Sequence, residues 1–348
     1  MASVRVAVIG TGWGGSTVLP GFRCVEGAEV VAVVSGRLER AVAAAAEHGV
    51  ADAFDDYRAM LDAVKPDLVA ITTPPFLHRE MTLAALAAGA HVLCEKPLAM
   101  NVAEGADMLD AAERLGRIHA VDFEHRFIPA RVAFSRLLAE GAVGEPYFFR
   151  MVDFSGMRRG QPYGWWFDRT RGGGVLQATV SHQIDAIRGW LGEFDRVTAD
   201  LRSVMPERSA ASGDGATQRV TADDTALVSF RLRSGLTGCM DFCWVARGQV
   251  RRTEVFGTEG VLILEGTKVF RAVDGEPQEI PIEDRDQTRL DDPRIGPFVE
   301  LAQRLVDRIN GKESGTFATL REGLEVQRVM DAIRQASDEG HEVIVGRD

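Results

Sequence analysis

The sequence predicts an α/β plus α+β protein: an N-terminal doubly wound Rossmann domain over residues 1–124 and a C-terminal α+β domain, built on a largely antiparallel open sheet, over residues 125–348. Up to about residue 124, short apolar runs alternate with Ala-rich helical patterns, as in doubly wound sheets, and a glycine-rich turn follows the first run. Beyond that point, strand-like runs follow one another with only turns between them, which is typical of antiparallel sheets.

The predicted strands of the first domain are short and continuously apolar, as expected when helices cover both faces of a parallel sheet. They lie at residues 4–9, 29–34, 51–54, 67–72, 91–94 and 118–123. Apolar residues at three- and four-residue spacing predict crossover helices between them. These segments are 37–48, 78–88 and 102–115.

The second domain has seven predicted strands punctuated by glycine and turn residues. They lie at residues 146–154, 197–204, 225–232, 236–244, 251–257, 260–265 and 268–273. One predicted helix, at about 182–191, interrupts this series, and two more, at about 294–310 and 318–338, close the chain. The last of these helices is able to dock back on the Rossmann domain.

Charge and composition restrict the partners that we expect. A net charge of −11 disfavours nucleic acid and anionic membranes, because both would repel the surface, so small molecules are the expected ligands. No apolar run reaches the length of a membrane span. The N-terminal residues enter a strand pattern by Val4 without a secretion signal, and the four cysteines lack zinc or redox spacing. We therefore expect a cytoplasmic protein with reduced thiols and no metal site.

The segment GTGWGG, residues 10–15, fits GxGxxG between a predicted strand and a helix. Gly10, Gly12 and Gly14 permit a tight turn and a close approach of the backbone, so that a pyrophosphate can bind the amides at the helix start, with Trp13 beside it. A structural glycine turn is the alternative interpretation. The position of the motif favours dinucleotide binding.

The end of the second predicted strand indicates which dinucleotide binds. An acidic residue there would bind the ribose 2′-hydroxyl of NAD, but this chain has Ser35, Arg37 and, one helical turn later, Arg40. A hydroxyl and guanidinium groups suit a 2′-phosphate, so the sequence favours NADP. NAD stays possible, since both arginines could belong to a solvated helix face.

The segment ITTPPFLH, residues 71–78, follows the fourth strand at the carboxyl edge of the sheet, where open α/β sheets bind ligands. Thr72, Thr73, Pro74 and His78 are therefore candidates for lining the cofactor site. For His78, capping of the following helix is an equal alternative.

The tripeptide EKP, residues 95–97, ends the fifth strand on the same edge. By itself, Lys96 before a proline could lie in a solvated turn. Together with the motifs above, however, the sequence resembles the glucose-fructose oxidoreductase, inositol dehydrogenase and MocA family. The resemblance extends over nearly the whole chain through HRFIP (125–129), GAVGEP (141–146), WWFD (165–168), GGGVLQATVSHQID (172–185) and FGTEGVL (256–262).

The resemblance implies roles for further residues. It places Lys96 against the nicotinamide ribose and the reacting oxygen, with a cis peptide bond before Pro97. It also implies that Trp165 lies against the nicotinamide and that Glu95 and Arg126 belong to the cofactor site. A second-domain sheet of this family implies a homodimer or homotetramer.

One position departs from the family pattern, in which GGG is followed after three residues by Asp and after three more by His. Here the aspartate position is Ala178 and the histidine is His182, which titrates near neutrality and suits proton transfer. Asp185 follows three residues later on the same helical face and could orient the imidazole or act as a structural cap.

The loop of residues 155–174 contains Arg158, Arg159, Arg169 and Arg171 but only one acid, Asp168. These arginines either pair with acids of a neighbouring subunit or stay in water, or one or two of them bind a carboxylate or phosphate of the substrate.

The sequence thus predicts an NADP(H)-preferring oxidoreductase that interconverts a secondary alcohol and a ketone on a sugar, cyclitol or related polyol. The substrate class follows from the resemblance alone. The alternatives are a nicotinamide-dependent glycoside hydrolase or lyase with internal redox cycling and a non-catalytic dinucleotide sensor.

Overall fold

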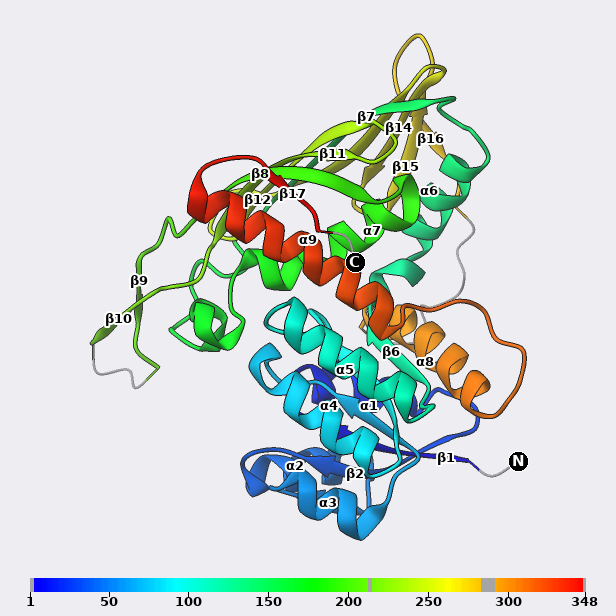
Figure 1. The fold of residues 1–348 in the computed structure, drawn as a ribbon, viewed down its shortest axis with the longest axis vertical. Coiled ribbons are helices and arrows are strands. Elements are labelled where there is room, and N and C mark those ends of the chain that lie inside the picture. The colour runs from blue at the N-terminus through cyan, green and yellow to red at the C-terminus, as the bar shows by residue number, and fades with distance from the viewer. Residues whose placement is uncertain (1–2, 212–214, 283–291, 347–348) are drawn as a thin grey trace. The chain divides into compact units, whose positions relative to one another are not determined.

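The computed structural model describes residues 3–211, 215–282 and 292–346. The chain divides into two compact units (Figure 1). The first combines Met1–Ile128 with Asp286–Glu325, and the second combines Pro129–Arg285 with Val326–Asp348. The sequence pattern placed the boundary at 124 and assigned all of 125–348 to the second domain, whereas the segment 286–325 belongs to the first unit.

The first unit contains a six-stranded parallel sheet in the order β3-β2-β1-β4-β5-β6, the order of a doubly wound dinucleotide-binding fold. The expected fold class and the six predicted strands are confirmed. Their bounds are β1 Val4–Ile9, β2 Ala28–Val34, β3 Asp52–Phe54, β4 Leu68–Ile71, β5 His91–Glu95 and β6 His119–Asp122. The strand β4 is buried along its whole length, because helices cover both faces of the sheet.

The helices of the first unit connect these strands, apart from α8, which comes from the later segment. They are α1 Leu19–Phe22, α2 Leu38–His48, α3 Tyr57–Val64, α4 His78–Ala87, α5 Val102–Arg114 and α8 Ile295–Ile309. The two-turn helix α3 was not predicted, although its start is marked by Asp56, whose side chain accepts from the amide of Arg58. In the core, α1 packs against α8 with Phe22 and Phe298 edge to face at 5.4 Å.

The second unit contains a nine-stranded sheet in the order β16-β15-β14-β13-β7-β12-β11-β8-β17, antiparallel except for the parallel pair β7 and β12. The seven predicted strands are all present, and the short strands β16 and β17 at its two edges were not predicted. The bounds are β7 Pro146–Phe154, β8 Phe194–Arg202, β11 Thr225–Leu232, β12 Thr237–Cys243, β13 Val250–Gly257, β14 Gly260–Glu265, β15 Lys268–Ala272, β16 Gln278–Ile280 and β17 Val343–Ile344.

Three further helices are α6 Pro129–Ala139, α7 Ser181–Leu191 and α9 Leu320–Glu339, of which α6 was not predicted. Strand β11 alternates buried and more exposed residues, so one face of the sheet is covered and the other is open. Helix α6 contacts β14 and β15 and packs against α7, where Phe134 meets Trp190 at 4.9 Å.

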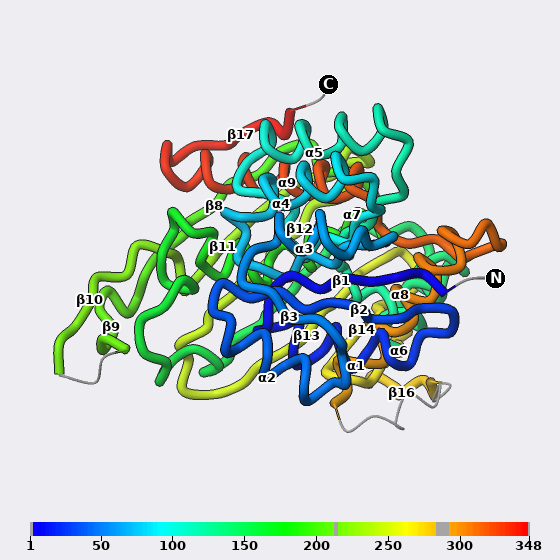
Figure 2. The backbone as a smooth tube through the Cα atoms, turned by 90° about the horizontal axis from the view of Figure 1, so that it is seen from below, coloured from blue at the N-terminus to red at the C-terminus, as the bar shows by residue number. Residues whose placement is uncertain are grey.

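A separate two-stranded hairpin, β9 Glu207–Ser209 with β10 Thr217–Arg219, extends away from the nine-stranded sheet in both views (Figures 1 and 2). It was not predicted, since its strands are only three residues long. None of the helices in the described part of the chain combines the length and apolar character that crossing a bilayer requires.

Candidate active site

The glycine-rich turn after β1 is shaped by Thr72. Gly10 has a φ of +112°, and a Cβ there would lie 2.6 Å from Oγ1 of Thr72 and 2.8 Å from its carbonyl oxygen. A Cβ at Gly14 would lie 2.6 Å from the same hydroxyl, which donates to the carbonyl of Ile9 at 3.0 Å. At Gly12, by contrast, no described atom lies within 4 Å of the Cβ position. The turn is therefore closed against β4 and open at Gly12, and it fits a pyrophosphate at the start of the helical run.

The end of β2 has the polar residues that the sequence indicated. Oγ1 of Thr11, in the glycine-rich turn, lies 3.3 Å from Oγ of Ser35, so the two hydroxyls join the turn to β2. Arg37 has extended backbone angles just before α2, and the side chains of both Arg37 and Arg40 are exposed. A hydroxyl and two exposed guanidinium groups thus lie where a Rossmann fold holds the adenosine ribose.

His78 connects two loops at the carboxyl edge of the sheet. Its ring is fully buried, with Nε2 2.8 Å from the carbonyl oxygen of Thr73 and Nδ1 3.0 Å from that of Pro97. Burial lowers the pKa of the imidazole. His78 therefore fixes the loop after β4 against the loop after β5. The N-cap residue of α4 is Leu77, which makes no capping hydrogen bond with its side chain.

Lys96 follows the last residue of β5, and the peptide bond between Lys96 and Pro97 is cis, as the resemblance implies. The Lys96 side chain is 12% exposed, and its Nζ lies 3.7 Å from Oε1 of Glu95. A largely buried ammonium group at the carboxyl edge is able to stabilise negative charge on an oxygen atom.

Asp122 is a residue that sequence reasoning missed. It ends β6 directly beside Glu95, its partner in the β5–β6 register, and it is only 1% exposed. The indole Nε1 of Trp13 donates to Oδ2 of Asp122 at 3.2 Å. Burial raises the pKa of both carboxyl groups, and that of Glu95 is well above its usual range. The useful signal was a charged residue at the end of an apolar strand. A charged residue at the corresponding place after β5 singled out Lys96.

Arg126 lies in the short helical turn Glu124–Phe127 that follows β6. Its charge helps to lower the pKa of Glu322, a residue of α9 that belongs to the first unit. Arg126 thus lies near the carboxyl edge and close to the start of α9.

In the second unit, two close contacts require glycine within the GGG segment. A Cβ at Gly173 would lie 2.5 Å from the carbonyl oxygen of Trp166, and one at Gly174, where φ is +112°, would lie 2.5 Å from Oδ1 of Asp223. Oδ2 of Asp223 in turn accepts from the amide of Leu176 at 2.8 Å. Asp223, which the sequence did not single out, thereby holds the start of the following helical segment.

That segment begins with the π-helical turn Leu176–Val180, which leads directly into α7. His182 and Asp185 both lie on α7 and are 5% and 3% exposed. Their three-residue spacing places them on one helical face. A π-helical turn directly before such a pair is frequent at functional sites.

The family's aspartate position, Ala178, lies within this turn, between the polar residues Gln177 and Thr179. Oγ1 of Thr179 accepts from Nε1 of Trp244 at 2.9 Å. Gln177 is fully buried, and neither of its amide atoms has a hydrogen-bond partner in the described part of the chain. No carboxylate occupies the family position, but polar groups flank it on both sides.

Three guanidinium groups of the 155–174 loop have partners within or next to the loop. Arg158 lies 4.0 Å above the ring of Trp166, which also stacks on Trp165 at 3.9 Å. Arg159 donates to the carbonyl of Val245, and Arg169 pairs with Asp338 at 2.6 Å. Arg169 thus has an acidic partner in its own chain, a possibility that the sequence did not indicate, and the guanidinium groups of Arg158 and Arg159 contact a ring and a carbonyl oxygen.

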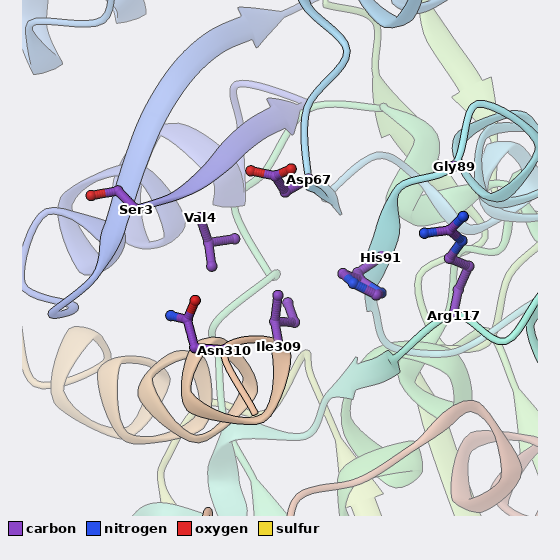
Figure 3. A pocket seen from close by; sticks show the side chains of 8 residues that line it. All are labelled: Ser3, Val4, Asp67, Gly89, His91, Arg117, Ile309 and Asn310. Carbon is purple, nitrogen blue, oxygen red and sulfur yellow. The ribbon is translucent and has the colours of Figure 1, made fainter. Parts of the chain in front are cut away.

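A cavity of about 240 Å³ lies at the opposite, amino edge of the parallel sheet. Figure 3 shows that its lining includes residues at the starts of β1 and β5, such as Val4 and His91. Because ligands of doubly wound sheets bind at the carboxyl edge, this cavity is separate from the candidate cofactor site.

The doubly wound sheet and the glycine-rich turn define a dinucleotide-binding protein. Residues 4–123 match the GFO/IDH/MocA oxidoreductase family with its NAD-binding Rossmann fold, and residues 132–263 match the GFO/IDH/MocA C-terminal domain. The chain therefore belongs to the GFO/IDH/MocA family, and it is an NAD(P)-dependent dehydrogenase of that family.

Several relatives are named as dehydrogenases of sugars or inositols. The chain is 31% identical to an uncharacterised oxidoreductase of Synechocystis, over 99% of this chain and 96% of that protein. It is 39% identical to the D-glucoside 3-dehydrogenase of Escherichia coli over 54% of each chain. Among solved structures, a levoglucosan dehydrogenase in complex with NADH and L-sorbose has a TM-score of 0.88 and 25% identity, over 99% of both chains.

Proposed function

We propose that this protein is an NADP(H)-preferring dehydrogenase that interconverts a secondary alcohol and a ketone on a sugar, cyclitol or related polyol. The observation that carries the proposal is Lys96, a largely buried cation on the carboxyl edge that also presents the open turn at Gly12. Relatives named D-glucoside 3-dehydrogenase, levoglucosan dehydrogenase and myo-inositol 2-dehydrogenase support the substrate class.

The preference for NADP rests on the end of β2. A 2′-phosphate has nearly two negative charges, and Ser35, Arg37 and Arg40 offer a hydroxyl and two guanidinium groups to it. The carboxylate that would bind the ribose hydroxyls of NAD is missing at these positions. Structures of a relative contain NADH, which is a property of that relative.

The remainder of the cofactor is proposed to bind along the carboxyl edge of the sheet. Its pyrophosphate binds the turn of Gly10, Gly12, Trp13 and Gly14, while Thr72, Thr73 and Pro74 line the path to Glu95 and Lys96. His78 supports this path by fixing its two loops. The family resemblance adds Arg126 and Trp165.

The bound nicotinamide supplies a two-electron hydride acceptor or donor. Lys96 stabilises the developing negative charge on the substrate oxygen, and His182 is proposed to hydrogen-bond to the same oxygen and assist the transfer of its proton. Asp185, which lies on the helical face of His182, orients the imidazole in place of the carboxylate that is missing at Ala178.

The substrate is proposed to be neutral. Arg158 and Arg159, the loop residues that could have bound an anion, are engaged by Trp166 and by the carbonyl of Val245. A neutral polyol can be recognised instead by hydroxyl and amide groups such as those of Gln177 and Thr179.

The open face of the nine-stranded sheet is proposed to form a homodimer or homotetramer. Phe148 and Phe256 are neighbours in the β7–β13 register, with rings 6.0 Å apart, and they share the face of the sheet on which Leu227 is 48% exposed. A sheet face that combines such large apolar side chains with charged ones, among them Arg150 and Asp241, suits a second copy of the chain. Sedimentation of the protein and of Leu227→Lys tests this, with dissociation expected for the variant.

Assays with a panel of polyols and ketoses, both cofactors and optical detection of reduced nicotinamide test the proposed activity. Net formation or consumption of the reduced cofactor supports a dehydrogenase. Cleavage of a glycoside without any net change would instead indicate a hydrolase with internal redox cycling.

A further inference from the structure

We propose that the carboxyl groups of Glu95 and Asp122 share one proton, that the pair loses it when the oxidised cofactor binds, and that it regains a proton from the substrate through Lys96. The inference rests on the proposed function, because it assigns a destination to the proton that alcohol oxidation releases. Glu95 and Asp122 act through Lys96, and Trp13 positions the pair.

The two carboxyl groups are adjacent because they end neighbouring parallel strands. Glu95 and Asp122 are paired in the β5–β6 register, so their side chains leave the sheet on the same face. Two ionised carboxyl groups at neighbouring buried positions would repel each other, and one proton held between them removes that repulsion. The pair therefore has a single negative charge while the proton is present.

Burial makes a second negative charge costly at this position. Asp122 is 1% exposed, and the Glu95 side chain is 13% exposed. Oε2 of Glu95 and Oδ1 of Asp122 are both buried, and neither has a hydrogen-bond partner among the residues that the structure describes. Two unpartnered carboxyl oxygens at one point in the interior indicate a group that changes its protonation state rather than a permanent ion pair.

The groups around the pair set the balance of its charge. Lys96 favours ionisation, whereas the buried Glu124 opposes the ionisation of Glu95. Trp13 donates a hydrogen bond to Asp122, and Arg294 lies 5.4 Å from the indole ring of Trp13. Cys94, the preceding residue of β5, is a buried thiol whose pKa is raised by burial, so it is neutral.

The pair lies on the side of the sheet that faces the reacting half of a dinucleotide. The adenosine ribose is held at the end of β2, on one side of the glycine-rich turn. The strand order β3-β2-β1-β4-β5-β6 places β5 and β6 on the other side of that turn. Glu95 and Asp122 thus lie toward the nicotinamide half, and an oxidised nicotinamide would bring a positive charge there.

Charge balance follows from this arrangement. Before reaction, the oxidised nicotinamide and Lys96 each contribute +1, and the doubly ionised pair contributes −2. A bound oxidised nicotinamide would accept the hydride released when the C–H bond of the alcohol breaks. The Lys96 ammonium would first give a proton to the pair through one water, which can bridge the 3.7 Å between Nζ and Oε1 of Glu95, and the amine so formed would take the O–H proton of the alcohol. Afterwards the charges are 0, +1 and −1, so the net charge is unchanged.

Titration calorimetry of the full chain tests the proposal without a substrate. Oxidised and reduced NADP, and in parallel NAD, are titrated near pH 7 in two buffers with different ionisation enthalpies, which gives the number of protons released. We expect release of roughly one proton with the oxidised cofactor and close to none with the reduced one. Equal release with both oxidation states would overturn the proposal.

Variants then identify the source of the proton. Asp122→Asn, which keeps an oxygen acceptor for Trp13, and Glu95→Gln should each abolish the release while the protein still binds cofactor. Glu47→Gln, an exposed acid of α2, should behave like the unmodified protein. If Lys96→Met abolishes the release and Asp122→Asn does not, Lys96 is the source and the proposal is wrong.

The calorimetric test does not depend on the proposed function. Proton release is measured with whichever oxidised cofactor the chain binds, even if the chain binds NAD better than NADP or oxidises no polyol. The calorimetric result therefore decides the role of the pair separately from the substrate and from the cofactor preference.

Discussion

Trp13 and Asp122 are joined by a hydrogen bond of 3.2 Å across 109 residues of sequence, so the glycine-rich turn after β1 is fastened to the end of β6. The bond connects the proposed pyrophosphate site with the carboxyl pair beside Lys96. It is the structural reason to expect that cofactor binding and the protonation of Glu95 and Asp122 influence each other.

Replacement of Trp13 by Phe should weaken cofactor binding. The variant keeps an aromatic ring but removes the Nε1 donor, so Asp122 loses a partner and the turn loses its tether. Affinity for NADP should fall by about three- to tenfold, since one hydrogen bond contributes about 1 kcal/mol. Calorimetric dissociation constants test this. Unchanged affinity would show that the bond does not hold the turn in its binding conformation.

Replacement of Arg37 by Ala should remove most of the preference for NADP. In the unmodified protein NADP should bind about tenfold tighter than NAD, because a charge-assisted hydrogen bond to the 2′-phosphate contributes more than 1 kcal/mol. The exposed Arg23, in the first unit but after α1, provides a control as Arg23→Ala. Tighter binding of NAD to the unmodified chain would refute the proposed preference.

The stability of Glu95→Gln relative to the unmodified protein should depend on pH. Burial raises the pKa of Glu95 above its value in the unfolded chain, so the folded protein binds more protons between the two values. The contribution of Glu95 to stability is therefore present near pH 4.5 and is lost as pH rises toward the folded-state pKa. The advantage of Glu95→Gln should grow between about pH 5 and 7, by at most roughly 1.4 kcal/mol per unit.

Urea unfolding at several pH values measures this difference, with Glu47→Gln as a control that should follow the unmodified protein. A difference between Glu95→Gln and the unmodified protein that stays constant with pH would show that Glu95 has the same pKa in both states.

Replacement of Asp223 by Ala should destabilise the segment that leads to His182. The variant leaves the buried amide of Leu176 without its acceptor, which costs about 1–3 kcal/mol of unfolding free energy. Asp223→Asn keeps an acceptor oxygen and should recover most of that loss. Denaturant midpoints compare the three proteins. Equal stability of Asp223→Ala and the unmodified chain would mean that the contact does not hold the π-helical turn.

Replacement of Arg158 by Ala should affect neutral and anionic sugars equally. Arg158 packs on Trp166 and lies 5.4 Å from the ring of Trp244, so its loss loosens the loop rather than removing an anion site. We expect the same fractional rise in KM for a neutral sugar and its acid or phosphate. A rise confined to the charged substrate would restore the hypothesis of an anion-binding loop.

The sequence predicted the elements whose local pattern agrees with their environment. The continuously apolar β4 and the alternating β11 are examples, because burial on two faces or on one face leaves a different pattern in the residues. Helix α3 was missed, since eight residues hold only two turns of periodicity. Helix α8 was predicted as a helix, but its packing of Phe298 on Phe22 joins residues far apart in sequence, and no local pattern specifies that contact.

The same limit applies to the candidate site. The turn at Gly10 was expected from its motif, and the cis bond before Pro97 was expected from the family resemblance. Asp122 and Asp223 were missed because their roles arise only from partners distant in sequence, Trp13 and Leu176 respectively. The sequence left open whether the arginines of the 155–174 loop bind an anionic substrate, and in the structure Arg158 packs on a ring, Arg159 donates to a carbonyl and Arg169 pairs with Asp338.

Steady-state rates with Lys96→Met and His182→Ala test the central claim most directly. The reduced cofactor is followed optically during oxidation of a neutral polyol by NADP. We predict net reduction of the cofactor by the unmodified protein and a loss of about a hundredfold or more in kcat for each variant, with cofactor binding retained in His182→Ala. Near-normal turnover by Lys96→Met, or product formation without any net change in the cofactor, would contradict the claim.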